Sequence, residues 1–498
     1  MKKIKLFLVS HWFGICLLFI LILATVLRFY NYENRWGLAY DQAHDSIVAR
    51  YALENHKIPL VGPFSSAGPF QTGGEWYWFI MAATVFYPNA IITPWVVLTL
   101  LHALFVLLII FVGKELVNKK FGLIVGLLAT VSTAQIAQAT NLTNQSPLAI
   151  IALSAIWMMI SYVKKKELKY LFLLALFVSL ASTIHLQGAA LIILVPITII
   201  LTRPPLVKGI IVLLLGIFIP LIPLILFDLQ NNFVNSHSML RYYLYDQYKI
   251  SLDVLGRRWL TFIGIFLPNS WSHIIGGNLI LGYIVMTLSG FAIVYNFLKS
   301  QLSKEWYILV ISFFGMLVLL RYTRTPLFDS FIVFMHPFIL LFTALAIFSI
   351  YKKNVVIGLS FMFLIVIGSL LKDIREIKLA TNYLAPWSRE QEKALIRNFP
   401  NHKFAIYDFK NKTGGVSLPL VLFLNVDKKI DDEGIKLGVV ISTNGAQFKY
   451  PIVFGDKEGY KILNLNNSNN AQLRNEGWIF INPSQVYKST EEWHSGSL

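Results

Sequence analysis

The sequence predicts an all-α polytopic membrane bundle of about 11 transmembrane helices, with outer juxtamembrane helices and a small α+β domain at the C-terminus. Three observations predict this fold class. The 498-residue chain is 56% hydrophobic and only 14% charged, with a mean hydropathy of +0.61, whereas soluble domains are about 25% charged. Apolar stretches of bilayer length follow one another up to residue 371, and the composition then becomes polar. A soluble core, a disordered chain and a coiled coil are therefore excluded.

The apolar stretches give the expected order of helices. Spans are predicted at 8–28, 91–113, 121–138, 146–163, 170–186, 188–202, 207–227, 276–298, 306–320, 330–350 and 354–371. Two shorter apolar stretches, 76–88 and 259–268, are expected to lie along the outer face as juxtamembrane helices. Cys16 is the only cysteine, which excludes an intrachain disulfide and a Cys-based zinc site.

The distribution of charge predicts the orientation. The short loops on the N-terminal side hold sixteen Lys and Arg against three Glu, while the opposite side up to residue 371 holds ten against nine acids. This bias places the N-terminus in the cytoplasm, and the odd number of spans places the C-terminal domain outside the plasma (inner) membrane. The net charge of +17 therefore sets topology, and no nucleic-acid partner is predicted.

The polar tail, 372–498, is predicted to be a soluble extracytoplasmic α+β domain. A helix is expected at 388–399, with Ser388 and Gln391 forming a capping box. The stretches FAIYDF, PLVLFL, KLGVVIS, YPIVF and WIFIN have the composition of strands. No catalytic triad, phosphate-binding loop or metal motif is present in this tail.

The first outer loop, 29–90, holds the polar residues most suggestive of chemistry. Asp41, His44 and Asp45 share one face of a helix predicted at about 41–55, and Ala43, Ile47 and Tyr51 form an apolar stripe that suggests a helix on the membrane surface. The alternatives are that Asp41 is an N-cap and that Asp45 stabilises the first turn. A metal held by the three polar residues lacks a fourth ligand and is not predicted.

This loop also resembles a known family. It reads D-Q-A-x-D-S-x-V-A-R, then P-L-x-G-P, S-x-G-P and G-G-E-W-Y-W, after a first helix that ends in LRFY. The pattern is similar to that of bacterial members of glycosyltransferase family 39, which have the GT-C fold and are relatives of protein O-mannosyltransferases and of the aminoarabinose transferase that modifies lipid A. The resemblance covers about 1–350 in layout, including FDLQNNFVNSHSMLRYYL and DSFIVFMHP.

The resemblance implies a catalytic acid beside a polyprenyl-monophosphate sugar donor, and by position that acid is Asp41. Gln42 stands where the family commonly has Glu, so Asp45 is the candidate second acid. Glu75 occupies a position where the family has Pro, and its role is open between supporting acid and ion-pair partner. A carboxylate base and fixed cations on the leaving phosphate suffice for such a transfer, so no cofactor is obligatory; a divalent cation is possible but not predicted.

Further substrate contacts are candidates by position. The residues expected to contact phosphate are Arg321, Arg324, Arg257 and Arg258. His185 and Gln187 could contact sugar hydroxyls or equally cap helix ends. His44 is a further candidate for substrate binding, and a surface or packing role is its alternative.

The sequence therefore predicts a transferase domain at 1–371 and a soluble domain at 372–498. The predicted activity moves a sugar from a polyprenyl-monophosphate carrier to an extracytoplasmic hydroxyl of a protein, lipid or glycan, with Asp41 as base and inversion as the outcome that the family implies. Two alternatives remain: a transporter or carrier-lipid flippase, and a non-catalytic assembly subunit.

Overall fold

The computed structural model describes residues 2–65, 68–246, 261–321, 329–410, 414–441, 449–455 and 459–491. They form two compact units. We call the first the helical unit; it comprises Met1–Tyr32, Pro63–Gly74 and Val97–Ala380. The second, the mixed unit, comprises Glu33–Gly62, Glu75–Val96 and Thr381–Leu498. The first outer loop therefore contributes its helices to the same unit as the C-terminal tail, and the predicted boundary at residue 371 falls inside a helix that runs to Leu379.

Helices make up nearly all of the helical unit. They are α1 (Lys2–Phe29), α4 (Thr93–Leu116), α5 (Lys119–Thr130), α6 (Thr133–Gln138), α7 (Leu148–Lys165), α8 (Leu168–Ile184), η2 (Leu186–Ile193), α9 (Leu194–Thr202), α10 (Leu206–Gln230), α11 (Val234–Arg241), η3 (Tyr242–Asp246), η4 (Phe262–Phe266), α13 (Leu267–Ile274), α14 (Leu279–Leu298), α15 (Lys304–Arg321), η5 (Asp329–Met335), α16 (His336–Lys353) and α17 (Val355–Leu379). A short turn η1 (Tyr32–Asn34) follows α1, and strands β1 (Val61–Phe64) and β2 (Gln71–Gly73) pair with each other.

All eleven predicted spans are helical among the described residues. Seven helices in that part of the chain are long and apolar enough to cross a membrane: α1, α4, α7, α10, α14, α16 and α17. Helix α15 has 18 residues, as α7 does, and the remaining predicted spans are shorter or broken. The predicted span 121–138 divides at Val131–Ser132 because the Ser132 hydroxyl caps a new helix. The chain is a multi-pass membrane protein, and the predicted all-α bundle with a small C-terminal sheet domain is confirmed.

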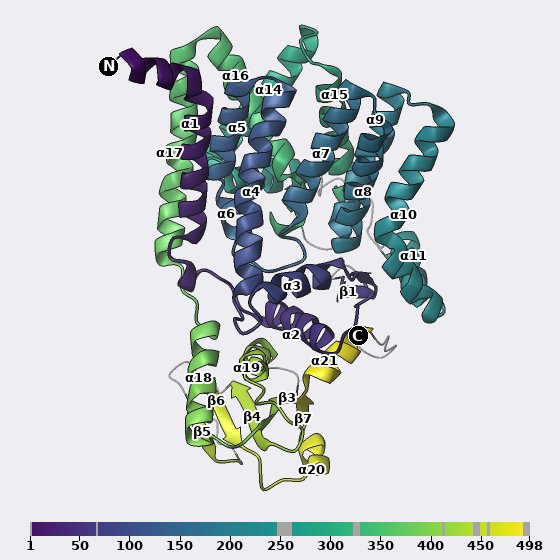
Figure 1. Ribbon diagram of the computed structural model, residues 1–498, viewed down its shortest axis with the longest axis vertical. Helices are drawn as coiled ribbons and strands as arrows, with labels where there is room; N and C mark the ends of the chain where they lie inside the picture. The colour runs from purple at the N-terminus through teal and green to yellow at the C-terminus, as the bar shows by residue number, and fades with distance from the viewer. Residues whose placement is uncertain are drawn as a thin grey trace. The chain divides into compact units, whose positions relative to one another are not determined.

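Helix α16 lies at the centre of the helical unit, with 94% of its apolar segment buried, whereas the corresponding segments of α1 and α17 are 22% buried. Figure 1 shows α1 and α17 at one side of this unit and α10 at the other. Close packing of α4 on α5 depends on Gly122 and Gly126, because a Cβ at these positions would lie 2.4 Å from the Ile110 carbonyl oxygen and 2.2 Å from the Ile110 side chain. Small residues four apart permit such close approach of two membrane helices.

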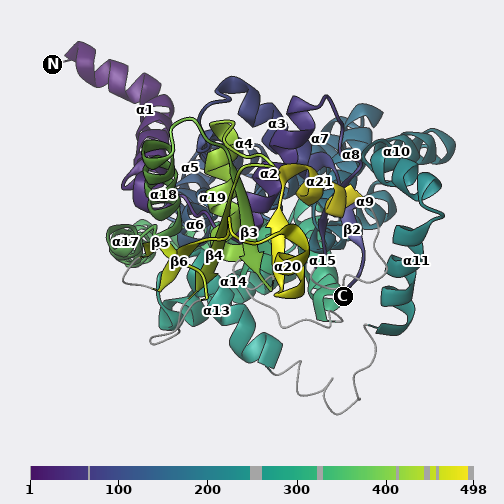
Figure 2. The same cartoon turned by 90° about the horizontal axis from the view of Figure 1, so that it is seen from below.

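The mixed unit contains two helices of the first outer loop, α2 (Tyr40–Glu54) and α3 (Glu75–Phe86), together with the C-terminal elements. The latter are α18 (Leu384–Asn398), β3 (Phe404–Phe409), α19 (Gly414–Val426), β4 (Ile435–Ile441), β5 (Ile452–Gly455), β6 (Tyr460–Asn464), α20 (Asn470–Asn475), β7 (Trp478–Ile481) and α21 (Pro483–Glu491). The sheet has the order β5-β6-β4-β3-β7, with β3 and β4 parallel and the other pairs antiparallel. Figure 2 shows its strands side by side.

Two predictions for the C-terminal tail are wrong. The stretch PLVLFL lies in helix α19 and not in a strand; a parallel pair such as β3 and β4 needs a crossover connection, which α19 supplies. Helix α18 begins at Leu384, so Ser388 lies inside the helix and forms no cap. The predicted strands FAIYDF, KLGVVIS, YPIVF and WIFIN correspond to β3, β4, β5 and β7, while β6 was not predicted.

The two predicted juxtamembrane stretches are helical where they are described. Helix α3 covers most of 76–88, and η4 with the start of α13 covers 262–268.

Candidate active site

Helix α2 carries the candidate acids of the first outer loop. Its N-cap is Ala39, whose N–H donates to the Gln42 side-chain oxygen at 3.2 Å. Asp41 is therefore the second residue of the helix, and the alternative that it is the N-cap is wrong. The Gln42 side chain thus takes part in the capping of this helix.

The Asp41 carboxyl lies on the exposed side of α2, and within the described residues it makes no hydrogen bond or ion pair. Partial withdrawal from water raises its pKa above the ordinary value, the Asp45 charge raises it further, and His44 opposes the rise. A carboxylate with no donor and a raised pKa keeps its capacity to accept a proton.

Asp45 has the opposite environment. Its side chain is buried, and its Oδ2 accepts from the Trp76 indole N–H at 2.7 Å. Its Oδ1 accepts from the Tyr77 hydroxyl at 3.4 Å and lies 3.1 Å from His44 Nδ1. Asp45 is the sixth residue of α2, so first-turn stabilisation does not account for it. Both of its oxygens are bound inside the mixed unit, which leaves Asp41 as the available acid.

The rest of α2 is held by packing on several sides. Ala43 and Ile47 are fully buried, Tyr51 packs on Tyr487 of α21 with ring centres 5.2 Å apart, and the Arg50 guanidinium donates to the carbonyls of Pro88 and Ala90. Burial lowers the Arg50 pKa to about 10. The expectation that the apolar stripe lies on the membrane surface is wrong, because protein covers it.

A groove of about 290 Å³ lies beside the candidate acids within the mixed unit. Tyr40 and His44 form one wall, with their rings stacked 6.1 Å apart. The polar residues of the other walls are Asp408, Asn482, Gln485 and Ser489. Burial raises the Tyr40 pKa, and the charges of Asp41, Asp408 and Asp45 raise it further. A carboxylate, two amides, a hydroxyl and an aromatic pair around one groove suit a ligand that carries several hydroxyl groups.

Glu75 begins α3 immediately before Trp76 and Tyr77, and its side chain is half-buried. The predicted choice between supporting acid and ion-pair partner remains open.

His185 and Gln187 form a helix cap, which is the alternative to a sugar contact. The His185 Nδ1 accepts from the Gln187 backbone N–H at 3.3 Å and caps helix η2, and its Nε2 lies 3.1 Å from Gln145 Nε2. Asn144 donates to the carbonyl of Ile184, the last residue of α8, at 3.0 Å. The NLTNQ turn therefore contacts the junction between α8 and η2.

The predicted phosphate ligands lie outside the described residues or at their edge. Arg257, Arg258 and Arg324 are not described, and Arg321 ends α15 with only its backbone described. Another arginine of the outer segments, Arg28, is buried and donates to the carbonyls of Ala24, Ala129 and Thr130.

A polar cluster not predicted from the sequence lies inside the helical unit. His102 Nδ1 lies 3.2 Å from the Gln135 oxygen, and the Gln135 nitrogen lies 2.6 Å from His336 Nδ1. Thr133 donates to Asp373 at 2.6 Å. Apart from Thr133 and Gln135, which are two residues apart, these residues are widely separated along the chain, so no local pattern could indicate the cluster. Among the described residues, no group of three or more His, Cys, Asp and Glu could hold a metal ion.

Trp76, Tyr77 and Asp408 are site residues that the sequence reasoning missed. Nothing in the E-W-Y-W motif indicates that the Trp76 indole and the Tyr77 phenol bind Asp45. Asp408 lies in β3, a strand of the distant C-terminal tail, and no spacing rule connects it to α2.

The fold matches known membrane glycosyltransferases. The crystal structure of ArnT from Cupriavidus metallidurans in the apo state aligns with a TM-score of 0.62 at 10% identity, covering 92% of this chain and 99% of that one. The same protein bound to undecaprenyl phosphate gives 0.60 at 10% identity, covering 91% and 98%. The oligosaccharyltransferase AglB from Archaeoglobus fulgidus, in complex with an inhibitory peptide and a dolichol-phosphate, gives 0.51 at 12% identity, covering 97% and 78%.

A structure of the Archaeoglobus fulgidus oligosaccharyltransferase in the apo form aligns with a TM-score of 0.48 at 14% identity, covering 78% of this chain and 59% of that one. No family model and no curated protein matches the chain. The alignments with ArnT and AglB show that the chain has the GT-C fold of membrane glycosyltransferases.

Proposed function

We propose that this protein is a membrane glycosyltransferase that moves a sugar from a polyprenyl-monophosphate carrier to a hydroxyl group of an extracytoplasmic acceptor. Asp41 is the general base of the reaction. The observation that carries the proposal is the contrast on α2 between Asp41, which has no partner among the described residues, and Asp45, whose two oxygens are bound.

The GT-C fold supports this reaction class. The ArnT structure of the same fold is bound to undecaprenyl phosphate, and the AglB structure is in complex with a dolichol-phosphate. A carrier of this kind explains why the enzyme lies in a membrane, because its chain loses about 0.8 kcal/mol for each CH₂ that leaves the bilayer.

The reaction needs one proton transfer and one displacement. Asp41 takes the proton of the acceptor hydroxyl as its oxygen forms a bond to the anomeric carbon, and the bond from that carbon to the phosphate oxygen breaks. Polyprenyl monophosphate leaves with the bonding electrons. Attack from the face opposite the phosphate inverts the anomeric configuration.

Asp45 is a positioning residue in this scheme. Trp76 and Tyr77 fix its carboxylate, and its charge contributes to the raised pKa of Asp41. A base whose pKa lies closer to the operating pH transfers a proton more effectively. His44, which is bonded to Asp45, opposes the rise in the Asp41 pKa.

Arg321, Arg324, Arg257 and Arg258 are proposed to bind the donor phosphate, and Glu75 is proposed to support the acids. His185 and Gln187 are proposed to lie near the sugar, where their helix cap at η2 contacts the NLTNQ turn. The bias of Lys over the short loops supports a cytoplasmic N-terminus, an extracytoplasmic C-terminal domain and a location in the plasma (inner) membrane.

The proposal is tested with the purified full chain in proteoliposomes that contain labelled polyprenyl-monophosphate sugars, each carrying one sugar. A transferase consumes one donor and yields polyprenyl monophosphate together with a labelled product. A flippase instead moves the intact donor between leaflets without consuming it, and an assembly subunit does neither. Consumption of no donor, with acceptor extracts from the source cells present, would contradict the proposal.

A further inference from the structure

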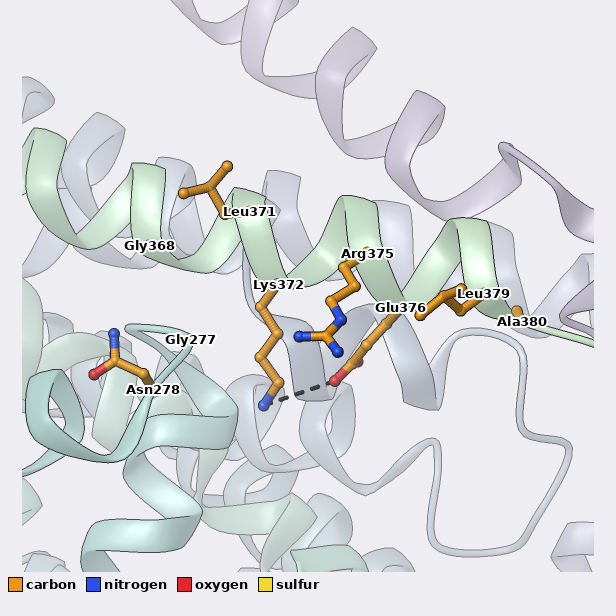
Figure 3. Close-up of a pocket in the computed structure, with 9 residues that line it drawn as sticks. All are labelled: Gly277, Asn278, Gly368, Leu371, Lys372, Arg375, Glu376, Leu379 and Ala380. Atoms are coloured by element: carbon orange, nitrogen blue, oxygen red, sulfur yellow. Dashed lines mark ion pairs between the residues drawn. The ribbon is translucent and has the colours of Figure 1, made fainter.

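A second polar groove lies in the helical unit, along the C-terminal half of α17. It encloses about 710 Å³. Its α17 wall is a single stripe in which residues recur three or four apart, and its other wall is the turn before α14. The lining residues are Gly277, Asn278, Gly368, Leu371, Lys372, Arg375, Glu376, Leu379 and Ala380. Figure 3 shows the charged side chains of α17 pointing to the same side of the helix.

The turn that forms the second wall is fixed against α17. The Gly276 N–H donates to the Ser369 hydroxyl at 2.8 Å. Gly277 has a φ of +78°, and a Cβ there would lie 2.3 Å from the Gly368 carbonyl oxygen. The backbone of the turn therefore packs directly on the backbone of α17, and the groove is preformed.

The charges in the groove favour an anion. Lys372 is held by His273 Nδ1 at 3.3 Å and by the Glu376 carboxylate at 3.8 Å. The Arg375 side chain is exposed and has no hydrogen bond or ion pair among the described residues. The 20-residue helix α14 begins at this wall, so the positive end of its dipole adds to the two cations. Two cations three residues apart, one already positioned, can hold a phosphate group between them.

The same stripe of α17 becomes apolar toward the middle of the span. Leu364, Ile367 and Leu371 precede the cations, and they are 54%, 51% and 66% exposed. The α17 segment is mostly unburied within the protein, so this surface faces lipid chains in a membrane. The groove thus has cations at the end of a span, and the adjoining surface of α17 toward the middle of the span is apolar. This arrangement matches a lipid with a phosphate head group.

We propose that this groove binds the phosphate head group of an anionic membrane phospholipid, with Arg375 and Lys372 on the phosphate and the acyl chains along α17. None of the groove residues is among the proposed catalytic or donor-binding residues. The site is therefore independent of the transfer reaction.

The experiment measures retention of phosphatidylglycerol by the detergent-solubilised full chain, using native mass spectrometry over a titration. Phosphatidylcholine with the same acyl chains is the control lipid, and glycerol phosphate is the control for a free phosphate group. Arg375→Gln is compared with Lys378→Gln, a matched change at an exposed lysine of α17 that does not line the groove. Glu376→Gln removes the one carboxylate among the described residues that line the groove.

We expect Arg375→Gln to weaken phosphatidylglycerol binding at least about tenfold, because a charge-assisted hydrogen bond is lost. Lys378→Gln should leave it within about twofold, and Glu376→Gln should strengthen it, since local repulsion of the phosphate falls. Arg375 has no partner in the described chain, so its substitution does not unfold the protein.

Equal weakening by Arg375→Gln and Lys378→Gln would overturn the proposal, because it would indicate general surface charge. Equal retention of phosphatidylcholine would also overturn it. Displacement of the lipid by an equal concentration of glycerol phosphate would show a site for free phosphate instead. The readout is lipid retention, so each result stands whether or not the proposed transfer is found.

Discussion

Asp45→Ala tests the assignment of the two acids of α2 to different roles. Asp45 accepts from the Trp76 indole and the Tyr77 hydroxyl, and both aromatic side chains are fully buried. Removing the carboxylate leaves two buried donors without this acceptor, at about 1–3 kcal/mol each. The Tyr77 contact is long, at 3.4 Å, so we expect a total loss of about 2–4 kcal/mol. For a unit of this size the loss lowers the unfolding midpoint by about 4–16 °C.

The assay is thermal unfolding of the purified protein followed by intrinsic tryptophan fluorescence, to which Trp76 contributes. Asp41→Ala is the matched control on the same helix. Asp41 has no partner among the described residues, so its substitution should change the free energy of unfolding by no more than about 0.5 kcal/mol. Equal midpoints for the two variants would refute the reasoning, because Asp45 would then not be the structural acid.

Three further predictions concern pH and backbone strain. His44→Ala removes the neighbour that lowers the Asp41 pKa, so the acid limb of the pH-rate profile for sugar transfer should move to higher pH; an unmoved limb would contradict Asp41 as base. Gly277→Ala should destabilise the protein by about 1–2 kcal/mol or more, because its φ is +78°. Gly290→Ala, with no atom near the new methyl group, should be neutral or stabilising in the same thermal assay. Burial raises the Glu491 pKa from 4.5 to about 7; the unfolded chain therefore loses this proton first, and stability should fall as pH rises through this range, but not in Glu491→Gln.

Long apolar stretches were the most predictable part of the molecule. Each predicted span is helical, because about 20 apolar residues in a row have few alternatives to a membrane helix. The helix carrying Asp41 and Asp45 was predicted within one residue of its bounds. Short apolar runs were ambiguous: PLVLFL forms helix α19 because the parallel pairing of β3 and β4 requires a crossover there, and that pairing is a long-range property.

The roles of the individual acids were beyond the sequence. Spacing placed Asp41 and Asp45 on one face, but which of them is bound depends on Trp76 and Tyr77, about thirty residues later. The groove beside them also needs Asp408 from the C-terminal tail. Contacts between segments so far apart follow from tertiary packing and leave no periodic pattern.

The central claim is that Asp41 is the base that activates the acceptor. The most direct measurement is the single-turnover rate at which purified protein releases polyprenyl monophosphate from the donor sugar, compared between the native chain and Asp41→Asn at saturating donor. General base catalysis contributes about 10²–10⁴ to a rate, so we predict a fall of at least about a hundredfold with donor binding unchanged. A rate for Asp41→Asn within a few-fold of the native rate would contradict the claim.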